Sequence, residues 1–278
     1  MITNAYSVLM SVYAKENPEW LRESMDSMLV QTTPPAEMVV VKDGALSRAL
    51  EEVLDEYSEM YPGLFNFVAY SENRGLGYAL HKGVLACRNP IIARMDTDDI
   101  AVPERMEMQL RAMREYDLDM VGSQVIEFDG ELGTCLTITD LPEEHEEILK
   151  YSKRRNPFRH PPITFKRAAV LAAGNYSSDF LYFEDWDLFN RMLAVGCKSK
   201  NLHDPLVYMR VNGDFYARRG GMRYLAHAYR FKKAQLERGW FTLRDFCLSF
   251  TPQAVVCLMP NSIRSYLYTN YLRKAPDK

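Results

Sequence analysis

The sequence lacks the features of several large classes of protein. Its five cysteines are widely spaced, odd in number and form no Cys-x-x-Cys pair. We therefore expect reduced, buried thiols in place of a disulfide framework or a zinc cluster. The chain also has no run of 18 apolar residues, and its first sixteen residues have neither a basic region nor a long apolar stretch. We expect no membrane-spanning helix and no signal peptide, and hence a cytoplasmic protein.

Net charge is low, at −3, but it is unevenly distributed. Residues 220–278 contain ten Lys or Arg and three Asp or Glu, which gives this segment +7 and leaves −10 for the remainder. A basic segment suits an anionic surface, and we favour membrane headgroups over nucleic acid as that surface. The 278 residues are 47% hydrophobic, which is ample for one large α/β domain, or for a domain of about 220 residues with a C-terminal addition.

Apolar residues follow the periods of alternating strands and helices. Apolar and β-branched runs predict strands over residues 6–13, 37–43, 64–70, 90–96, 119–128 and 206–211. The helical period predicts helices starting at Asn17 and Pro142, and over residues 46–60, 76–87, 104–116, 185–195 and 220–238. A hairpin is expected near Gly130 to Gly133, and short helices broken at Pro252 and Pro260. This alternation implies a mainly parallel sheet that is covered by helices on both faces.

Polar side chains follow three of these strands. Tyr13 comes after the first strand, Asp43 after the second, and residues 96–99 after the fourth. Ligands of parallel α/β sheets bind beyond the carboxyl ends of the strands. We therefore expect these side chains to converge on one site.

The stretch ARMDTDD, residues 93–99, concentrates negative charge at that edge. In an extended segment the side chains of Asp96 and Asp98 point the same way, so that one can reach a metal and the other a sugar hydroxyl. Carboxylates suit Mg²⁺ or Mn²⁺, which proteins commonly share with substrate phosphates. The alternative is a solvated acidic turn that precedes the helix near Pro103.

Several motifs in one order resemble the family 2 glycosyltransferases, the inverting GT-A enzymes that use nucleotide-sugar donors. The motifs cover about residues 5–215 and read SVLMSVYAKE, VVVKDG, ENRGLGYALHKG, ARMDTDD and FEDWDLFNRML. The pattern is most similar to bacterial exopolysaccharide and capsule enzymes of the amylovoran type. The resemblance implies a GT-A fold, with a nucleotide-sugar-binding and catalytic domain over residues 1–217 and a C-terminal helical extension over residues 218–278.

The resemblance also implies roles at the donor site. Tyr13 lies in the donor-binding loop, Asp43 and Asp96 lie near the uracil and ribose of a UDP donor, and Asp98 holds Mn²⁺ or Mg²⁺. Carboxylates suit these contacts because they accept hydrogen bonds from N–H and hydroxyl groups. For Asp43, a plain Asp-Gly turn stays open.

Two arginines are further donor-site candidates. Arg74 and Arg94 could each flank the base or a phosphate. Arg94 is the more unusual, because it lies in an apolar strand and a buried arginine requires an anion. A structural salt bridge of Arg94 with Asp96 or Asp99 is the open alternative.

The stretch FEDWDLFNRML supplies the candidate catalytic residues. Inversion requires a base that removes the proton of the acceptor hydroxyl, and the resemblance assigns this role to Asp185. Glu184 would orient this base or bind the acceptor, and Asp187 is a substitute candidate for the base. The alternative is that these acidic residues only complement the dipole of the helix that begins here.

Two loops carry the remaining candidates. His160 in RNPFRHPP matches a histidine of the related pattern near the acceptor or the diphosphate, with an ordinary loop histidine as the alternative. Arg219, in the Arg-Arg-Gly-Gly stretch, suits a mobile lid that clamps a phosphate. The alternative there is the basic start of a helix.

The C-terminal extension combines aromatic with basic residues over residues 240–274. Such a segment can lie in a membrane interface, where lipid-linked acceptors are found. Contact at the inner face of the cell membrane is therefore one expectation. Packing against the catalytic domain or against a partner chain is the other.

Together these features predict an inverting transfer of a sugar from a UDP-sugar to a hydroxyl of a growing, lipid-linked saccharide in bacterial surface polysaccharide synthesis. A non-catalytic subunit that binds a nucleotide or saccharide is the alternative from another class. A nucleotidyltransferase would need a glycine-rich basic loop after the first strand, and SVYAKENPEW has no glycine. No nucleic-acid partner is expected.

Overall fold

The computed structural model describes residues 5–130, 135–211 and 220–259. Its strands are β1 (Tyr6–Val12), β2 (Glu37–Asp43), β3 (Phe65–Tyr70), β4 (Ile91–Arg94), β5 (Ile100–Ala101), β6 (Met120–Phe128), β7 (Cys135–Ile138), β8 (Thr164–Lys166) and β9 (Ser199–Arg210). Its helices are α1 (Pro18–Leu29), α2 (Arg48–Met60), α3 (Leu76–Ala86), α4 (Arg105–Glu115), α5 (His145–Ser152), α6 (Arg167–Ala172), α7 (Glu184–Ala194), α9 (Gly221–Glu237) and α10 (Leu243–Leu258).

Most of the described strands form one path in the order β3-β2-β1-β4-β8-β6-β9-β5, and β7 pairs with β6 at its side. The first four strands of this path run parallel. Beyond β4 the sheet is mixed, because the short β8 runs antiparallel to both of its neighbours while β6 and β9 run parallel. The expected α/β fold is confirmed, and its parallel part places the ends of β1, β2 and β4 at one edge.

Two apolar cores cover the two faces of the sheet. Alternate residues of β1 face opposite ways: Val8 and Met10 belong to the core under α1, α2 and α4, whereas Leu9 belongs to the core under α3 and α7. In β2, Val40 belongs to the first of these cores and Val39 to the second. This period-two alternation of fully apolar strands is the pattern of a sheet buried on both faces.

Local sequence explains where the helices begin. The side chain of Asn17 accepts a hydrogen bond from the N–H of Glu19 at 2.9 Å, and Pro18 occupies the first turn of α1. Thr242 and Asp245 form a reciprocal capping box at the start of α10. Both arrangements satisfy N–H groups that a helix start leaves without partners.

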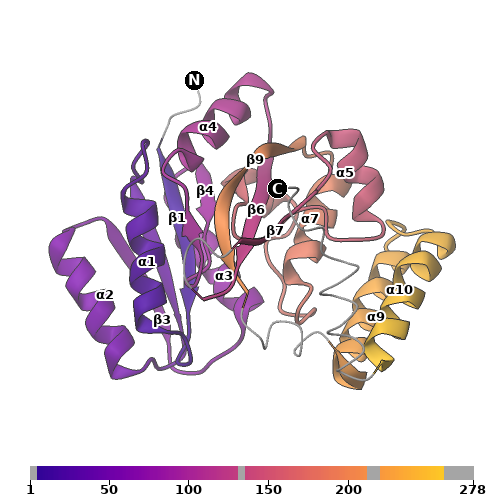
Figure 1. Ribbon diagram of the computed structural model, residues 1–278, viewed down its shortest axis with the longest axis horizontal. Helices are drawn as coiled ribbons and strands as arrows, with labels where there is room; N and C mark the ends of the chain where they lie inside the picture. Colours follow the sequence, from indigo (N-terminus) through magenta and orange to yellow (C-terminus); the bar gives the residue numbers. More distant parts are fainter. Residues whose placement is uncertain (1–4, 131–134, 212–219, 260–278) are drawn as a thin grey trace.

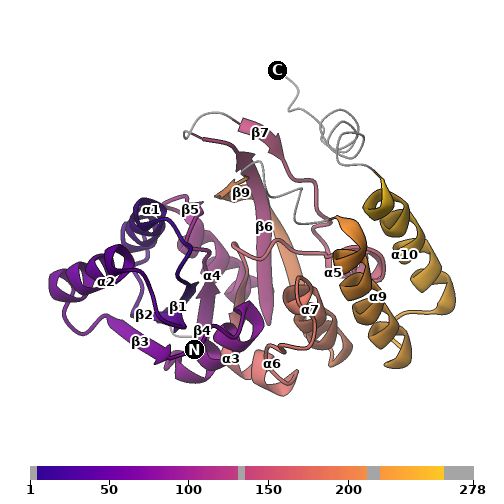
Figure 2. The same ribbon diagram turned by 90° about the horizontal axis from the view of Figure 1, so that it is seen from below.

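The C-terminal helices pack against the rest of the chain at the end of the molecule opposite α2 (Figure 1). α9 and α10 lie side by side, and α7 lies next to α9 (Figure 2). A third apolar core joins α7 and α9. In it the centre of the Phe231 ring of α9 lies 5.0 Å from that of Phe183, with the rings stacked, and 4.9 Å from that of Trp186. These contacts agree with the packing alternative for this segment as far as residue 259.

The expected break at Pro252 is wrong, because α10 continues through this residue. A proline leaves the carbonyl four residues earlier without its helical partner. That carbonyl belongs to Leu248, which lies on an exposed face of α10 with 45% of its surface accessible. α10 also packs on α9, where the centre of the Phe250 ring lies 5.6 Å from that of Tyr229. Pro260 lies outside the described residues.

No helix among the described residues is long and apolar enough to cross a membrane.

Candidate active site

The acidic cluster lies in the turn that follows β4. The backbone turns at Thr97 and Asp98, so the segment is not extended as expected. The turn itself brings the three aspartates together: one carboxylate oxygen each of Asp96, Asp98 and Asp99 lies within 4.8 Å of the other two. Three hard oxygen ligands at this spacing fit a divalent cation such as Mg²⁺ or Mn²⁺.

Burial makes this cluster unfavourable for negative charge alone. Burial, with the Asp96 carboxylate nearby, raises the pKa of Asp98 to about 6. The pKa of Asp99 is raised well above its usual range by burial and then by Asp98 and Asp96. A bound cation would remove this repulsion, because it favours the ionised form of each ligand.

Glu16 adds a fourth carboxyl group that we did not predict. It lies in the loop after β1, where its N–H donates to the Tyr13 carbonyl at 3.1 Å. Burial, followed by the charge of Asp98, raises the pKa of Glu16 to about 7. Glu16 belongs to the loop SVYAKENPEW, where Tyr13 alone is predicted as a site residue from the sequence. Tyr13 is half-buried in this loop.

Two buried arginines lie beneath the acidic turn. Arg94 is 1% exposed and forms an ion pair with Asp96, which is the salt bridge left open above. Its Nε and Nη1 have no hydrogen-bond partner among the described residues. Arg105, which we did not predict, donates from Nη2 to the Arg94 carbonyl at 2.7 Å. Both guanidinium groups therefore support the turn from inside the protein.

Arg210, at the end of β9, fastens the same turn from the other side. Its N–H donates to Asp99 Oδ1 at 2.7 Å, and its Nε donates to the Asp98 carbonyl at 3.1 Å. The guanidinium group also pairs with Glu23 at 2.6 Å and lies 4.7 Å from the centre of the Trp20 ring. The strand pattern LVYMRV predicted β9 but gave no sign of these long-range contacts.

Asp43, at the end of β2, organises the start of α3. Its Oδ1 accepts hydrogen bonds from the Arg74 N–H at 2.7 Å and from the Tyr70 hydroxyl at 2.9 Å. Its Oδ2 accepts from the Gly75 N–H at 3.0 Å. Asp43 is therefore more than part of an Asp-Gly turn, because it fixes the loop that precedes α3. The Arg74 side chain is exposed, and its guanidinium lies 5.0 Å from the centre of the Tyr78 ring.

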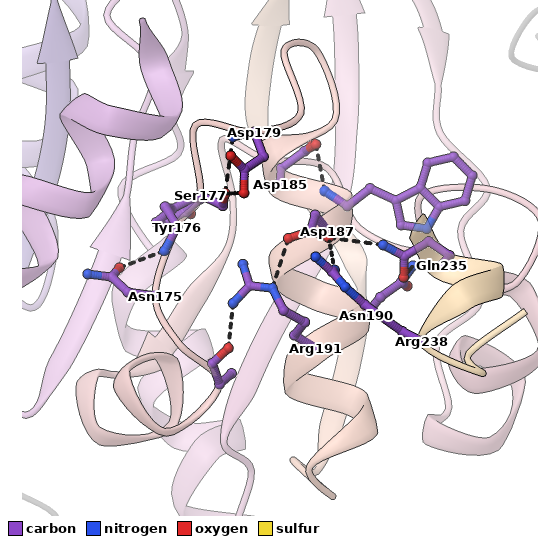
Figure 3. A network of polar contacts seen from close by, with 12 residues as sticks. Asn175, Tyr176, Ser177, Asp179, Asp185, Asp187, Asn190, Arg191, Gln235 and Arg238 are labelled. Carbon is purple, nitrogen blue, oxygen red and sulfur yellow. Dashed lines mark hydrogen bonds and ion pairs between the residues drawn. The ribbon is translucent and has the colours of Figure 1, made fainter. Parts of the chain in front are cut away.

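Asp185 lies in the first turn of α7 with both carboxylate oxygens hydrogen-bonded. Oδ2 accepts from Asn156 Nδ2 at 2.7 Å. Oδ1 accepts from the Trp186 N–H at 2.7 Å, a bond that Figure 3 shows. These contacts fix the orientation of the carboxylate, while the residue stays half-buried. Asn156, which sequence reasoning missed, belongs to the loop NPFRHPP.

Glu184, the residue before Asp185, is almost fully buried. It is 9% exposed, and its Oε2 has no hydrogen-bond partner within the described part of the chain. Burial, followed by the charge of Asp185, raises the pKa of Glu184 to about 7. A buried carboxyl group without a full set of partners destabilises a fold, so its presence here is more consistent with function than with structure.

The Glu184→Gln variant should show directly how much the burial of the ionised Glu184 carboxylate lowers the stability of the fold. The glutamate binds its proton more tightly when folded, so its burial costs nothing below pH 4.5 and reduces stability as the pH rises towards 7. We expect the variant to match the wild type near pH 4 and to exceed its free energy of unfolding by at most about 3 kcal/mol above pH 7. Denaturant unfolding across this range measures the difference. A variant less stable than the wild type at pH 8 would show that Glu184 has a structural role.

Asp187 is excluded as the substitute base. It is fully buried, and its Oδ1 accepts from Gln235 Nε2 at 2.9 Å and from Arg238 Nη1 at 2.5 Å. Its Oδ2 accepts from Arg191 Nε at 2.8 Å. Figure 3 shows this network, which joins α7 to α9 and to the residue that follows α9. Asp187 therefore anchors the C-terminal helices to α7.

His160 lies against the inner side of the site. Its Nε2 is 2.9 Å from the Tyr176 hydroxyl. Burial and the nearby Arg94 guanidinium keep the pKa of His160 well below its usual range, so the ring is neutral at pH 7. A neutral ring can hydrogen-bond but cannot supply positive charge to a diphosphate. Arg219 lies outside the described residues.

The Arg94 guanidinium acts on both Asp98 and Glu184. Burial raises the pKa of both Asp98 and Glu184, and the Arg94 guanidinium opposes the rise in each. One buried cation therefore lies close to the acidic turn after β4 and also to the first turn of α7. The carboxyl ends of β1, β2 and β4 lie at one edge of the sheet, and a single site formed by Tyr13, Asp43 and residues 96–99 at that edge stays a prediction.

The arrangement agrees with known proteins. The family model for "Glycosyl transferase family 2" matches residues 7–173. The chain is 33% identical over 273 residues to "UDP-Gal:alpha-D-GlcNAc-diphosphoundecaprenol beta-1,3-galactosyltransferase" of Escherichia coli, with 98% of each chain covered. It is 35% identical to "Amylovoran biosynthesis glycosyltransferase AmsE" of Erwinia amylovora, with 95% of this chain and 97% of that protein covered.

A solved structure has the same fold. The mannosyltransferase PcManGT from Pyrobaculum calidifontis, in complex with GDP-Man and Mn²⁺, superposes with a TM-score of 0.65 at 15% identity, over 96% of this chain and 79% of that one. The curled α/β sheet and the acidic turn at its edge thus define a glycosyltransferase of the GT-A type. The chain belongs to glycosyl transferase family 2.

Proposed function

We propose that this protein transfers a hexose from a UDP-sugar to a hydroxyl group of a growing, lipid-linked saccharide, with inversion, during synthesis of a bacterial surface polysaccharide. The observation that carries the proposal is the convergence of the Asp96, Asp98 and Asp99 turn with the first turn of α7. The named activity of the Escherichia coli relative supports the class of donor and acceptor, and the name of the Erwinia amylovora relative supports a role in polysaccharide synthesis.

The donor would lie along the carboxyl edge of the sheet. Asp43 and Asp96 would accept hydrogen bonds from the uracil and the ribose, with Tyr13 and Arg74 beside them. Asp98, with Asp96 and Asp99 close to it, would hold Mn²⁺ or Mg²⁺, which when bound neutralises charge on the diphosphate of the departing UDP. Arg94 would act by holding Asp96. Arg219, after β9, is proposed to contact the phosphates.

Asp185 would accept the proton of the acceptor hydroxyl. The N–H groups of Asn156 and Trp186 already hold its carboxylate in one orientation, which is what a general base requires. His160 is neutral and half-buried beside Tyr176, so we propose that it shapes the acceptor side by packing and hydrogen bonding. No covalent intermediate is needed for inversion.

The division into a catalytic domain over residues 1–217 and an extension over residues 218–278 stays part of the proposal. So does a cytoplasmic location with peripheral contact at the inner face of the membrane. The exposed Leu243, Leu248, Val255 and Leu258 of α10 support such contact, because exposed apolar side chains on one helix suit the headgroup region of a membrane.

Thermal-shift measurements with UDP-, GDP- and dTDP-sugars, with and without Mn²⁺, test the donor assignment. We expect UDP-sugars to raise the melting temperature of the protein only when Mn²⁺ is present. A ligand that binds the folded state alone stabilises that state against unfolding. At a ligand concentration of 100 Kd the gain is about 2.7 kcal/mol. Stabilisation by a GDP- or dTDP-sugar alone would show that the donor assignment is wrong.

A further inference from the structure

A small cavity lies beside the candidate base, between α3 and the loop that precedes α7. Its lining includes Gly75, Leu76 and Gly77 from the start of α3, and Ser177 and Glu184 from the opposite side. These walls are close together, because a Cβ atom on Gly77 would lie 2.4 Å from the Ser177 carbonyl oxygen. Only glycine at position 77 permits this approach, so the backbone of both walls is fixed.

The cavity contains hydrogen-bonding groups of both kinds. Glu184 is 9% exposed, and its Oε2 has no hydrogen-bond partner among the residues that the structure describes. The Gly75 N–H donates to Asp43, but no side chain caps the first turn of α3, so the N–H groups of Leu76 and Gly77 are available as donors. A helix start and an unpartnered carboxyl oxygen together offer a donor and an acceptor to a single ligand group.

A hydroxyl group matches this pair, because it donates one hydrogen bond and accepts others. A phosphate would be repelled by an ionised Glu184, and an ammonium group would find no acceptor at the helix start. The ligand is therefore an uncharged group that carries hydroxyls, as a hexose does.

Position decides between the donor hexose and the acceptor. Arg74 and Gly75 line the cavity, and their N–H groups donate to Asp43 at 2.7 and 3.0 Å. Asp43 is the proposed contact of the nucleotide, so the cavity lies on the nucleotide side of Asp185. We propose, on the basis of the proposed function, that Glu184 and the start of α3 bind one hydroxyl of the transferred hexose and so select the donor sugar.

Binding of donor analogues that each lack one hydroxyl tests this assignment without a known acceptor. Calorimetry in the presence of Mn²⁺ would compare UDP, the preferred UDP-hexose and its deoxy analogues. For the wild type, we expect removal of one particular hydroxyl to weaken binding by about 10- to 100-fold, the effect of one hydrogen bond to a charged group. For Glu184→Ala, removal of the same hydroxyl should have little further effect. UDP should bind both proteins equally.

Two further variants keep the test decisive. If Glu184→Ala folds poorly, Glu184→Gln can replace it, because it preserves the shape of the side chain. In Glu184→Gln, removal of the same hydroxyl should weaken donor binding less than it does in the wild type. Glu146→Gln changes an exposed glutamate of α5 and should behave like the wild type.

The outcomes separate this proposal from the proposed function. If Glu184→Ala weakens the parent donor and every deoxy analogue by the same factor, or weakens UDP equally, then the cavity does not bind the transferred hexose, although the glycosyltransferase function stands. A wild-type protein that binds no UDP-hexose in Mn²⁺ would instead contradict the proposed function itself.

Discussion

Replacing Asp98 with asparagine is expected to abolish cation-dependent transfer. Asp98 is the central member of the turn whose carboxylates lie within 4.8 Å of one another, and an amide loses the charge that a divalent cation requires. Cations contribute several kcal/mol to such reactions, so turnover should fall by about 10³-fold or more. The release of UDP from UDP-sugars, measured against Mn²⁺ concentration, checks this.

The same variant should fold normally. The pKa of Asp98 is raised to about 6, with burial as the largest cause, so removal of its charge relieves an unfavourable interaction in the absence of the cation. Asp55→Asn, an exposed change in α2, is the matched control and should leave turnover unaltered. An Asp98→Asn protein with wild-type turnover and wild-type Mn²⁺ dependence would remove Asp98 from the cation site.

Replacing Asp185 with asparagine should separate binding from chemistry. The variant loses the proton acceptor but keeps the hydrogen-bonding shape, so its kcat should fall by about 10²- to 10⁴-fold. Its affinity for UDP should stay at the wild-type level, because the proposed nucleotide contacts lie on β2 and after β4. Calorimetry and steady-state kinetics on one preparation measure both quantities.

Asp187→Asn provides the contrast within one helical turn. Asp187 is fully buried among Arg191, Gln235 and Arg238, so its replacement breaks a buried charged network and should lower thermal stability first. If Asp187→Asn eliminated turnover in a fully folded protein while Asp185→Asn did not, the two assignments would be reversed.

Much of the fold follows from local patterns. The β-branched runs and the helical period located most elements to within a few residues, because fully apolar strands and one-faced helices leave few other arrangements. Asp43 and Asp96 were predicted as site residues from their positions at or just after the ends of strands, and the structure places both at those ends. The topology of an α/β sheet is enough to bring such residues to one edge.

The missing parts of the site depend on contacts across the chain. Arg210 holds the acidic turn from a strand more than one hundred residues later, and no local pattern marks it. Asp185 and Asp187 both look like ordinary first-turn acids, and only the partners of Asp187 on and after α9 distinguish them. The turn at Thr97 replaces the expected extended segment, and hydrogen bonds from Arg210 to Asp99 and to the Asp98 carbonyl hold it.

The network around Asp187 connects the C-terminal helices directly to α7, which carries the proposed base Asp185. α9 and α10 do not touch the acidic turn after β4 through any contact described above, but they fix α7 through Arg238, Gln235 and the aromatic core at Phe231. The orientation of Asp185 therefore depends on packing of the C-terminal helices as well as on its own hydrogen bonds.

The most direct test of this account is a crystal of the protein grown with UDP and Mn²⁺, in which anomalous scattering locates the metal. We expect one manganese site bound by a carboxylate oxygen of Asp98 and by the diphosphate of UDP, at roughly the 2.0–2.2 Å that such hard cations adopt with oxygen. A nucleotide bound elsewhere, with the acidic turn after β4 facing only solvent, would contradict the account.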